Sequence, residues 1–108
     1  MPRSAERAAE NEATFRQANE TLEQKAGEIG LGEERTPYLC ECEDERCTEV
    51  IRLTRAEYEH VRADARRFVV VSSHQEADDR VLREDAGFTL IEKGGAEGDL
   101  VAERDPRA

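Results

Sequence analysis

The stretch of sequence that decides the fold is Cys40-Glu41-Cys42-Glu43-Asp44-Glu45-Arg46-Cys47, which holds all three cysteines of the chain. Free cysteines are usually buried, but five residues of this stretch are charged, so burying it whole in a core is awkward. In a strand, residues i and i+2 point to one face, so Cys40 and Cys42 can present two thiolates side by side. The residues that follow can turn the chain and bring Cys47 back as a third ligand. We interpret the spacing as most of a tetrahedral zinc site.

The fourth ligand has to come from elsewhere in the chain. His74 follows the predicted strand Phe68-Val69-Val70-Val71, in a polar loop that can fold over the cysteines. His60 is a competitor, but it lies in the middle of a predicted helix, where a role at the surface fits better. Asp44 or Glu45 can also complete the site, although zinc with three thiolates more often takes a histidine or a fourth cysteine.

The predicted metal site therefore comprises Cys40, Cys42, Cys47 and His74. Iron in place of zinc, redox chemistry and free thiols remain alternatives. The acidic residues nearby raise the pKa of a thiol and make it a poor nucleophile or redox sensor, whereas they favour a cation. A site closed by four protein ligands is structural, because a catalytic zinc keeps a position open for water. Ser72 and Ser73 precede His74, but adjacency in sequence does not create a triad, so we expect no enzyme.

The composition gives such a metal an energetic role. The chain has 108 residues, of which 39% are charged and only 5% are aromatic. The apolar residues that can build a core lie mainly between Leu39 and Ile91, and a core drawn from so short a segment is marginal without a metal, disulfides or a partner chain. We expect the metal to act as a staple.

The N-terminal part of the chain predicts one long helix over residues 4–29. Ala8, Phe15, Leu22 and Ile29 recur every seven residues, which is typical of a helix that packs along one stripe. Such a helix does not bury enough to stand alone, so it must dock on the domain, pair with a copy of itself or lie on a partner. Glycines after the helix predict a linker, and we place the boundary of this arm at about residue 35.

The sequence predicts an α+β fold, with the long N-terminal helix followed by a small metal-stapled domain of short antiparallel strands and one helix. Thr54-Arg55-Ala56-Glu57 is a capping box that starts the helix, which we expect to run to about Arg66. Strands are expected on both sides of the cysteines, at 68–71, and in a hairpin formed by 81–83 and 88–92. The predicted domains are an arm and linker at 1–35, a zinc-knuckle domain at 36–93 and a flexible tail at 94–108.

The formal net charge of −10 bears on partners and location. Phosphate backbones and anionic membranes repel such a surface, so we expect neither nucleic acid nor membrane binding. The charge indicates a well-solvated surface and is compatible with a basic protein partner. The sequence shows neither a signal peptide nor an apolar run of about 20 residues. We therefore expect a cytoplasmic protein with reduced thiols.

Several motifs together resemble a family of small uncharacterised bacterial proteins that have an N-terminal helical arm and a zinc-knuckle-like C-x-C-x4-C...H motif. The matching segments, which span most of residues 11–93, are Phe15, Asn19-Glu20, Tyr38-x-Cys40-Glu41-Cys42, Cys47, Leu53-Thr54-x-x-Glu57-Tyr58-x-x-Val61-Arg62, Phe68-x-Val70, His74 and Ile91-Glu92-Lys93. The resemblance implies a metal site at Cys40, Cys42, Cys47 and His74, and it implies no activity. The family commonly has Pro-Gly before the histidine, whereas this chain has Ser72-Ser73, which bears on the turn that positions His74.

These observations favour a non-catalytic zinc-binding protein that acts as a small protein-interaction or regulatory module, with a structural zinc. Its partner would be another protein or a second copy of the chain, bound through the N-terminal helix. The alternative is a redox- or zinc-responsive switch, in which loss of the metal from the cysteines releases the helical arm.

Overall fold

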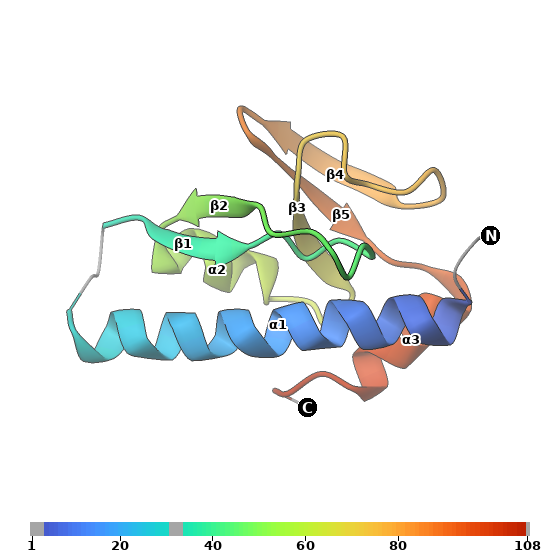
Figure 1. Cartoon of the computed structure of the whole chain (residues 1–108), viewed down its shortest axis with the longest axis horizontal. Helices are drawn as coiled ribbons and strands as arrows, with labels where there is room; N and C mark the ends of the chain where they lie inside the picture. The colour runs from blue at the N-terminus through green and yellow to red at the C-terminus, as the bar shows by residue number, and fades with distance from the viewer. Residues whose placement is uncertain (1–3, 31–33, 108) are drawn as a thin grey trace.

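The fold is α+β, as predicted, in a computed structural model that describes residues 4–30 and 34–107 (Figure 1). The elements follow in the order α1 (Ala5–Glu28), β1 (Thr36–Leu39), β2 (Val50–Leu53), α2 (Arg55–Val61), β3 (Arg67–Val71), β4 (Arg80–Asp85), β5 (Phe88–Glu92) and α3 (Gly95–Glu103). The long helix α1 runs beneath the strands, with α3 beside its N-terminal half (Figure 1).

The strands form two small antiparallel sheets. One sheet pairs β1 with β2, and the other has the order β3-β5-β4. The chain that leaves β1 joins the two sheets, because the backbone N–H of Glu41 donates to the carbonyl of Val69 on β3 at 2.9 Å. This connection sets the segment with the cysteines against the edge of β3.

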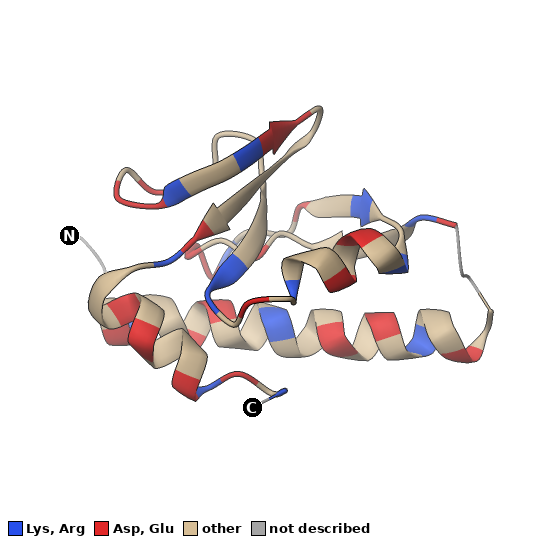
Figure 2. Ribbon diagram, turned by 180° about the vertical axis from the view of Figure 1, so that it is seen from behind, with Lys and Arg blue, Asp and Glu red and all other residues tan. Residues whose placement is uncertain are grey.

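The helix α1 docks on its own domain, through a face that includes Ala8 of the predicted stripe and only part of Leu22. Its buried residues are Ala8, Ala9, Glu12, Arg16, Asn19, Glu23 and Ala26. Phe15 and Leu22 are only half-buried, and Ile29 is 70% exposed. Charged residues recur along the whole of α1 (Figure 2), and several of them are covered by the domain. Most of the docking face is therefore polar.

Buried polar groups form the contact between α1 and the rest of the chain. We call Glu12, Arg16, Asn19, Glu41 and Lys93 the polar seam; each is at most 2% exposed. Arg16 lies over the ring of Phe68, 3.6 Å from its centroid, and donates to the carbonyls of Ala65 and Arg67. Buried charges need partners of this kind, so the seam determines how α1 sits on the domain.

The helix α2 begins with the predicted capping box but ends earlier than predicted. The hydroxyl of Thr54 accepts from the N–H of Glu57, and the carboxylate of Glu57 accepts from the N–H of Thr54 at 2.8 Å. The helix ends at Val61 instead of near Arg66. Asp64 accounts for the difference, since its carboxylate accepts from the N–H of Arg66 at 2.9 Å, a local bond that competes with the helix.

The described residues of the predicted flexible tail at 94–108 differ from that prediction, because they contain the helix α3, which packs against α1. The glycine at position 98 allows close packing here, since a Cβ at Gly98 would lie 2.6 Å from the carbonyl oxygen of Lys93. Beyond α3, the guanidinium of Arg107 pairs with the carboxylates of Glu20, Glu23 and Glu59. The contacts of α3 with α1 and the ion pairs of Arg107 therefore hold the C-terminal segment on the domain. No helix among the described residues is long and apolar enough to span a membrane.

Candidate metal centre

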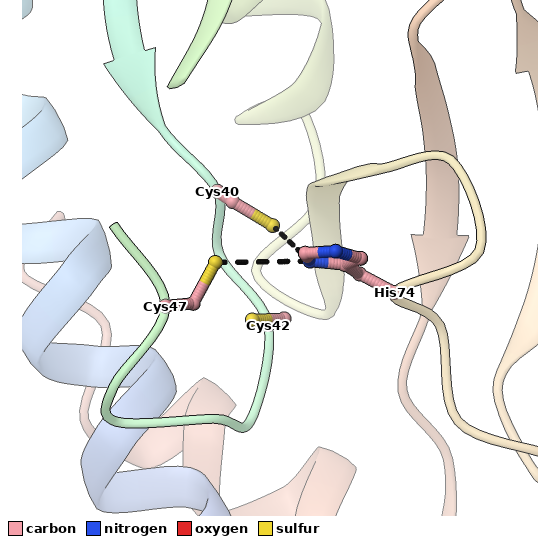
Figure 3. A group of neighbouring side chains, drawn as sticks. All are labelled: Cys40, Cys42, Cys47 and His74. Atoms are coloured by element: carbon pink, nitrogen blue, oxygen red, sulfur yellow. Dashed lines mark hydrogen bonds between the residues drawn. The ribbon is translucent and has the colours of Figure 1, made fainter. Parts of the chain in front are cut away.

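Four side chains from three separate segments meet at one point (Figure 3). They are Cys40, Cys42, Cys47 and His74, and one ligand atom of each lies within 4.8 Å of all the others. Nδ1 of His74 is 3.6 Å from Sγ of Cys40 and 3.7 Å from Sγ of Cys47. The three cysteines are free thiols. This group, the Cys3His cluster, could hold a metal ion.

The backbone around the cysteines returns on itself as the spacing predicts. The N–H of Cys40 donates to the carbonyl of Glu49 at 3.1 Å and so continues the pairing of β1 with β2 by one step. Asp44 organises the turn between them, because its carboxylate accepts from the N–H of Arg46 and its carbonyl accepts from the N–H of Cys47. These bonds place Cys47 opposite Cys40 and Cys42.

A tight turn after β3 carries His74 to the cluster. The N–H of His74 donates to the carbonyl of Val71 at 2.9 Å, and Ser73 has a φ of 74°. This left-handed conformation is free of cost only for glycine, and a serine adopts it at about 1 kcal/mol. The turn that Pro-Gly would favour therefore still forms with Ser72-Ser73.

The carboxylate of Glu49 orients the histidine ring, a role that the sequence reasoning missed. Oε2 of Glu49 lies 2.9 Å from Nε2 of His74, on the opposite side of the ring from the sulfurs. When Nε2–H donates to this carboxylate, the lone pair of Nδ1 is free to bind a metal, and the ligand becomes more basic. The sequence signal was the place of Glu49 directly before β2, where its carbonyl accepts from the N–H of Cys40.

The sulfurs interact strongly with one another. A hydrogen bond from the Cys40 thiol to Cys42, together with burial, raises the pKa of Cys40. The same bond lowers the pKa of Cys42 to about 5. Burial raises the pKa of Cys47. The cluster therefore carries one thiolate at neutral pH, and a cation among the sulfurs is needed to release the other two protons.

The acidic residues beside the cysteines do not act on the thiols as the sequence suggested. Hydrogen bonds between sulfurs and burial cause the pKa changes, and the pKa of Cys42 falls instead of rising. The carboxylates of Glu41 and Glu43, which alternate with the cysteines in the sequence, are engaged by other partners. Oε2 of Glu41 accepts from the hydroxyl of Tyr58 at 2.8 Å, and Oε2 of Glu43 lies 3.7 Å from Nζ of Lys93.

Glu41 and Asn19 connect the back of the cluster to α1. The amide of Asn19 donates to the carbonyl of Leu39 at 2.9 Å and to Oε2 of Glu41 at 3.0 Å, while its oxygen accepts from the N–H of Leu39 at 2.7 Å. Oε1 of Glu41 accepts from the N–H of Val69 at 3.2 Å. The residues that separate the cysteines are thus bound to α1 on one side and to β3 on the other.

Lys93 forms the other half of the polar seam. Its ammonium lies within 4 Å of four carboxylates, those of Glu12, Glu43, Asp79 and Glu97. One cation cannot balance four anions in a buried space. Burial, and then a hydrogen bond with Glu97, raise the pKa of Glu12 to about 10. A pKa raised this far keeps Glu12 protonated at neutral pH.

The other candidate ligands lie elsewhere. His60 lines a separate cavity beside α2. Glu45 pairs with Arg7 at 3.2 Å on the surface. Within residues 4–30 and 34–107, the Cys3His cluster is the single group of histidine, cysteine or acidic side chains close enough to share a metal.

Comparisons of the chain with protein-family models, with curated proteins and with solved structures find no match. No family is identified, so the resemblance to small bacterial proteins stays a prediction. The part of it that the structure supports is the meeting of Cys40, Cys42, Cys47 and His74 in a cluster that suits a metal.

Proposed function

We propose that the Cys3His cluster binds one structural zinc ion and that the protein is a non-catalytic, zinc-stabilised interaction module. The spacing of the ligand atoms carries the proposal. A zinc tetrahedron with Zn–S of about 2.3 Å and Zn–N of about 2.0–2.1 Å has S···N edges of about 3.6 Å. The distances from Nδ1 of His74 to the sulfurs of Cys40 and Cys47 are 3.6 and 3.7 Å.

The chemistry of the donors favours zinc. Three thiolates with one imidazole are a standard set for structural zinc, and soft sulfur ligands disfavour magnesium and calcium. The N–H of Val71 donates to Sγ of Cys40 at 3.2 Å, and Glu49 supports His74, so two of the ligands have an outer partner. Such outer contacts fix ligand orientation and raise affinity.

The proposed role of the metal is to stabilise the fold. The cluster joins the end of β1, the loop before β2 and the turn after β3, which are distant in sequence. Because metal binding to such a site adds directly to the folding free energy, zinc would compensate for the thin core. The interaction role rests on the exposed side of α1, which is left for a partner or a second copy, and includes Ile29 at 70% exposure.

A specific contact also supports the second candidate, a metal-responsive switch. The amide of Asn11 donates to the carbonyl of Glu43 at 2.9 Å, and Asn19 holds Glu41. Residues 40–43 thus carry both metal ligands and anchors for α1. Loss of zinc by oxidation or chelation would free this stretch and loosen α1.

Elemental analysis of the purified protein tests the metal. We expect one zinc per chain, and we expect His74→Ala to lower the occupancy well below one while His60→Ala, the matched control, retains it. Substitution with Co²⁺ should give the absorption bands of a tetrahedral thiolate site. Bound iron, a metal-free protein, or loss of metal in the His60 variant would contradict the proposal.

Hydrogen exchange after chelation separates the two roles. A structural zinc predicts that protection falls throughout the domain when the metal is removed. A switch predicts that α1 loses protection while β3 and β5 keep theirs. Retention of protection in all elements would exclude both.

A further inference from the structure

A cavity of about 290 Å³ lies between α2 and the β4–β5 hairpin, away from the cysteines. Its apolar lining consists of Leu53, Ala56, Val61, Phe88 and Leu90. The pocket is open to solvent, because Ala56, His60 and Arg83 in its lining are exposed, and an apolar group that covers its floor would remove that floor from water. Pockets that bind small molecules have this character, with a few polar groups that fix the orientation of the ligand.

The strand register explains why a charged residue joins this lining. Arg83 is paired with Leu90, and Asp85 with Phe88, so these four side chains share the face of the sheet that looks toward α2. The irregularity between Val81 and Arg83 shifts β4 by one residue and brings Arg83 onto this face. The bulge therefore places a guanidinium beside an apolar floor.

The polar groups of the lining differ in whether partners within the chain already engage them. The carboxylate of Glu57 is engaged, because it accepts from the N–H of Thr54 and from Arg35 at 3.1 Å. Nε of Arg83 pairs with Asp85 at 2.8 Å, which leaves its terminal nitrogens as donors. The imidazole of His60 makes no hydrogen bond or ion pair with the described part of the chain. The cavity thus combines an apolar floor with two side chains that can donate to an acceptor.

We propose that this cavity binds a small organic acid, in which one aromatic ring or branched chain is joined to a carboxylate. The apolar group lies against Phe88 and Leu90, and the carboxylate accepts from Arg83 and His60. Hydrogen bonds between a guanidinium and a carboxylate are the strong, oriented kind that select an anion in an otherwise acidic protein. The volume limits the ligand to about one ring with a short acid chain.

Titration of the full-length, ¹⁵N-labelled protein with phenylacetate tests the proposal by NMR. We expect amide shifts at Ala56, His60, Phe88 and Leu90, with a dissociation constant on the order of 1 mM for so small a ligand. Phenylacetamide has the same shape without the charge. Its dissociation constant should be at least about five times that of phenylacetate. Acetate, which lacks the ring, should leave these signals in place.

Three variants locate the site. Arg83→Gln should weaken phenylacetate about fivefold and leave phenylacetamide unchanged. Arg80→Gln, on the same face but outside the lining, is the matched control and should bind as the wild type. Ala56→Leu places a larger side chain in the cavity and should abolish binding of both ligands. Equal binding of acid and amide, binding that survives Ala56→Leu, or the absence of shifts around the cavity at 10 mM ligand, roughly ten times the expected dissociation constant, would overturn the proposal.

Discussion

The Cys3His cluster and the polar seam lie on opposite sides of one extended stretch, residues 40–43, and they achieve stability in different ways. The cluster brings together three thiols and an imidazole, which need a cation from outside the chain to become a stable group. The seam takes its partners from within the chain, as the ion pairs of Lys93 and the hydrogen bond from Asn19 to Glu41 show. The stability of the cluster should therefore depend on the medium, and that of the seam on the identity of its side chains.

The largest expected effect is on the cluster. Cys42→Ser should remove most of the metal-dependent stability, which is on the order of 10 kcal/mol for structural zinc, so that the chain no longer folds cooperatively at 25 °C. Thermal unfolding followed by circular dichroism, with zinc measured on the same sample, checks this. Arg46→Ala, in the same loop, serves as the control. A Cys42→Ser variant that melts at the wild-type temperature would show that the seam alone supports the fold.

In the seam, the largest effect is expected at Lys93, whose side chain is 2% exposed. Lys93→Met leaves the carboxylates of Glu43, Asp79 and Glu97 without their cation and should cost about 3–5 kcal/mol of unfolding free energy. Urea denaturation in saturating zinc measures it. Lys25→Met, at an exposed position that pairs only with Glu28, should cost less than about 0.5 kcal/mol. Similar losses for the two variants would mean that the buried ammonium contributes nothing special.

Removal of the amide that links α1 to β1 should have a smaller effect. Asn19→Ala leaves the N–H and the carbonyl of Leu39 without their partner and should cost about 2–3 kcal/mol. Gln17→Ala, on the exposed side of α1, is the control. Denaturation in zinc-saturated buffer checks the prediction, and an unchanged midpoint for Asn19→Ala would place the anchoring of α1 elsewhere.

Glu49 offers a way to change the cluster without changing the seam. Glu49→Ala removes the carboxylate behind His74 and should weaken metal binding at least tenfold, while stability in saturating zinc stays close to that of the wild type. Competition with a chromogenic chelator measures the affinity. Glu45→Ala, which removes a surface carboxylate from the neighbouring loop, should bind zinc as the wild type does. Equal affinities for the two variants would remove Glu49 from the site.

The proton held by Glu12 makes the stability of the fold depend on pH, with a defined sign. Its pKa is raised from about 4.5 in the unfolded chain to about 10 in the folded protein. The folded state therefore binds more protons between these values, and wild-type stability falls as pH rises through this window. Glu12→Gln should match the wild type near pH 5 and exceed it by at least about 1 kcal/mol at pH 8. A variant less stable than the wild type at pH 8 would mean that Glu12 is ionised against Lys93.

The Cys3His cluster, on one side of residues 40–43, could be predicted from the sequence because its signals are local. The spacing of the cysteines, the position of His74 after a β-branched strand and the capping box of Thr54 with Glu57 each have a short-range physical cause. These features predicted the α+β fold and the four residues that meet in the Cys3His cluster. The turn at Ser73 forms even though the residue is not glycine, because the bond from His74 to Val71 closes it.

The seam was not predictable because its charges look like ordinary surface residues until their partners are known. Glu12 and Lys93 are far apart in the sequence, so nothing near either residue indicates burial. The heptad of Ala8, Phe15, Leu22 and Ile29 therefore indicated only the margin of the docking face. Gly98 was ambiguous for a similar reason, since a glycine serves flexible segments and tightly packed helices alike, and only the position of the Lys93 carbonyl decides between them.

The alternation of thiol and carboxylate along residues 40–43 also constrains how this chain can vary in length. A strand that uses successive residues on opposite sides cannot slip by one position without exchanging the two sets. Deleting or inserting one residue between Tyr38 and Cys42 would turn the carboxylates toward the Cys3His cluster and the sulfurs toward α1. Both the cluster and the polar seam would then be lost together. The loss from a single substitution here can be compensated by another substitution, whereas the loss from a one-residue insertion or deletion cannot. The metal ligands and the residues that anchor α1 can therefore only be inherited as a unit.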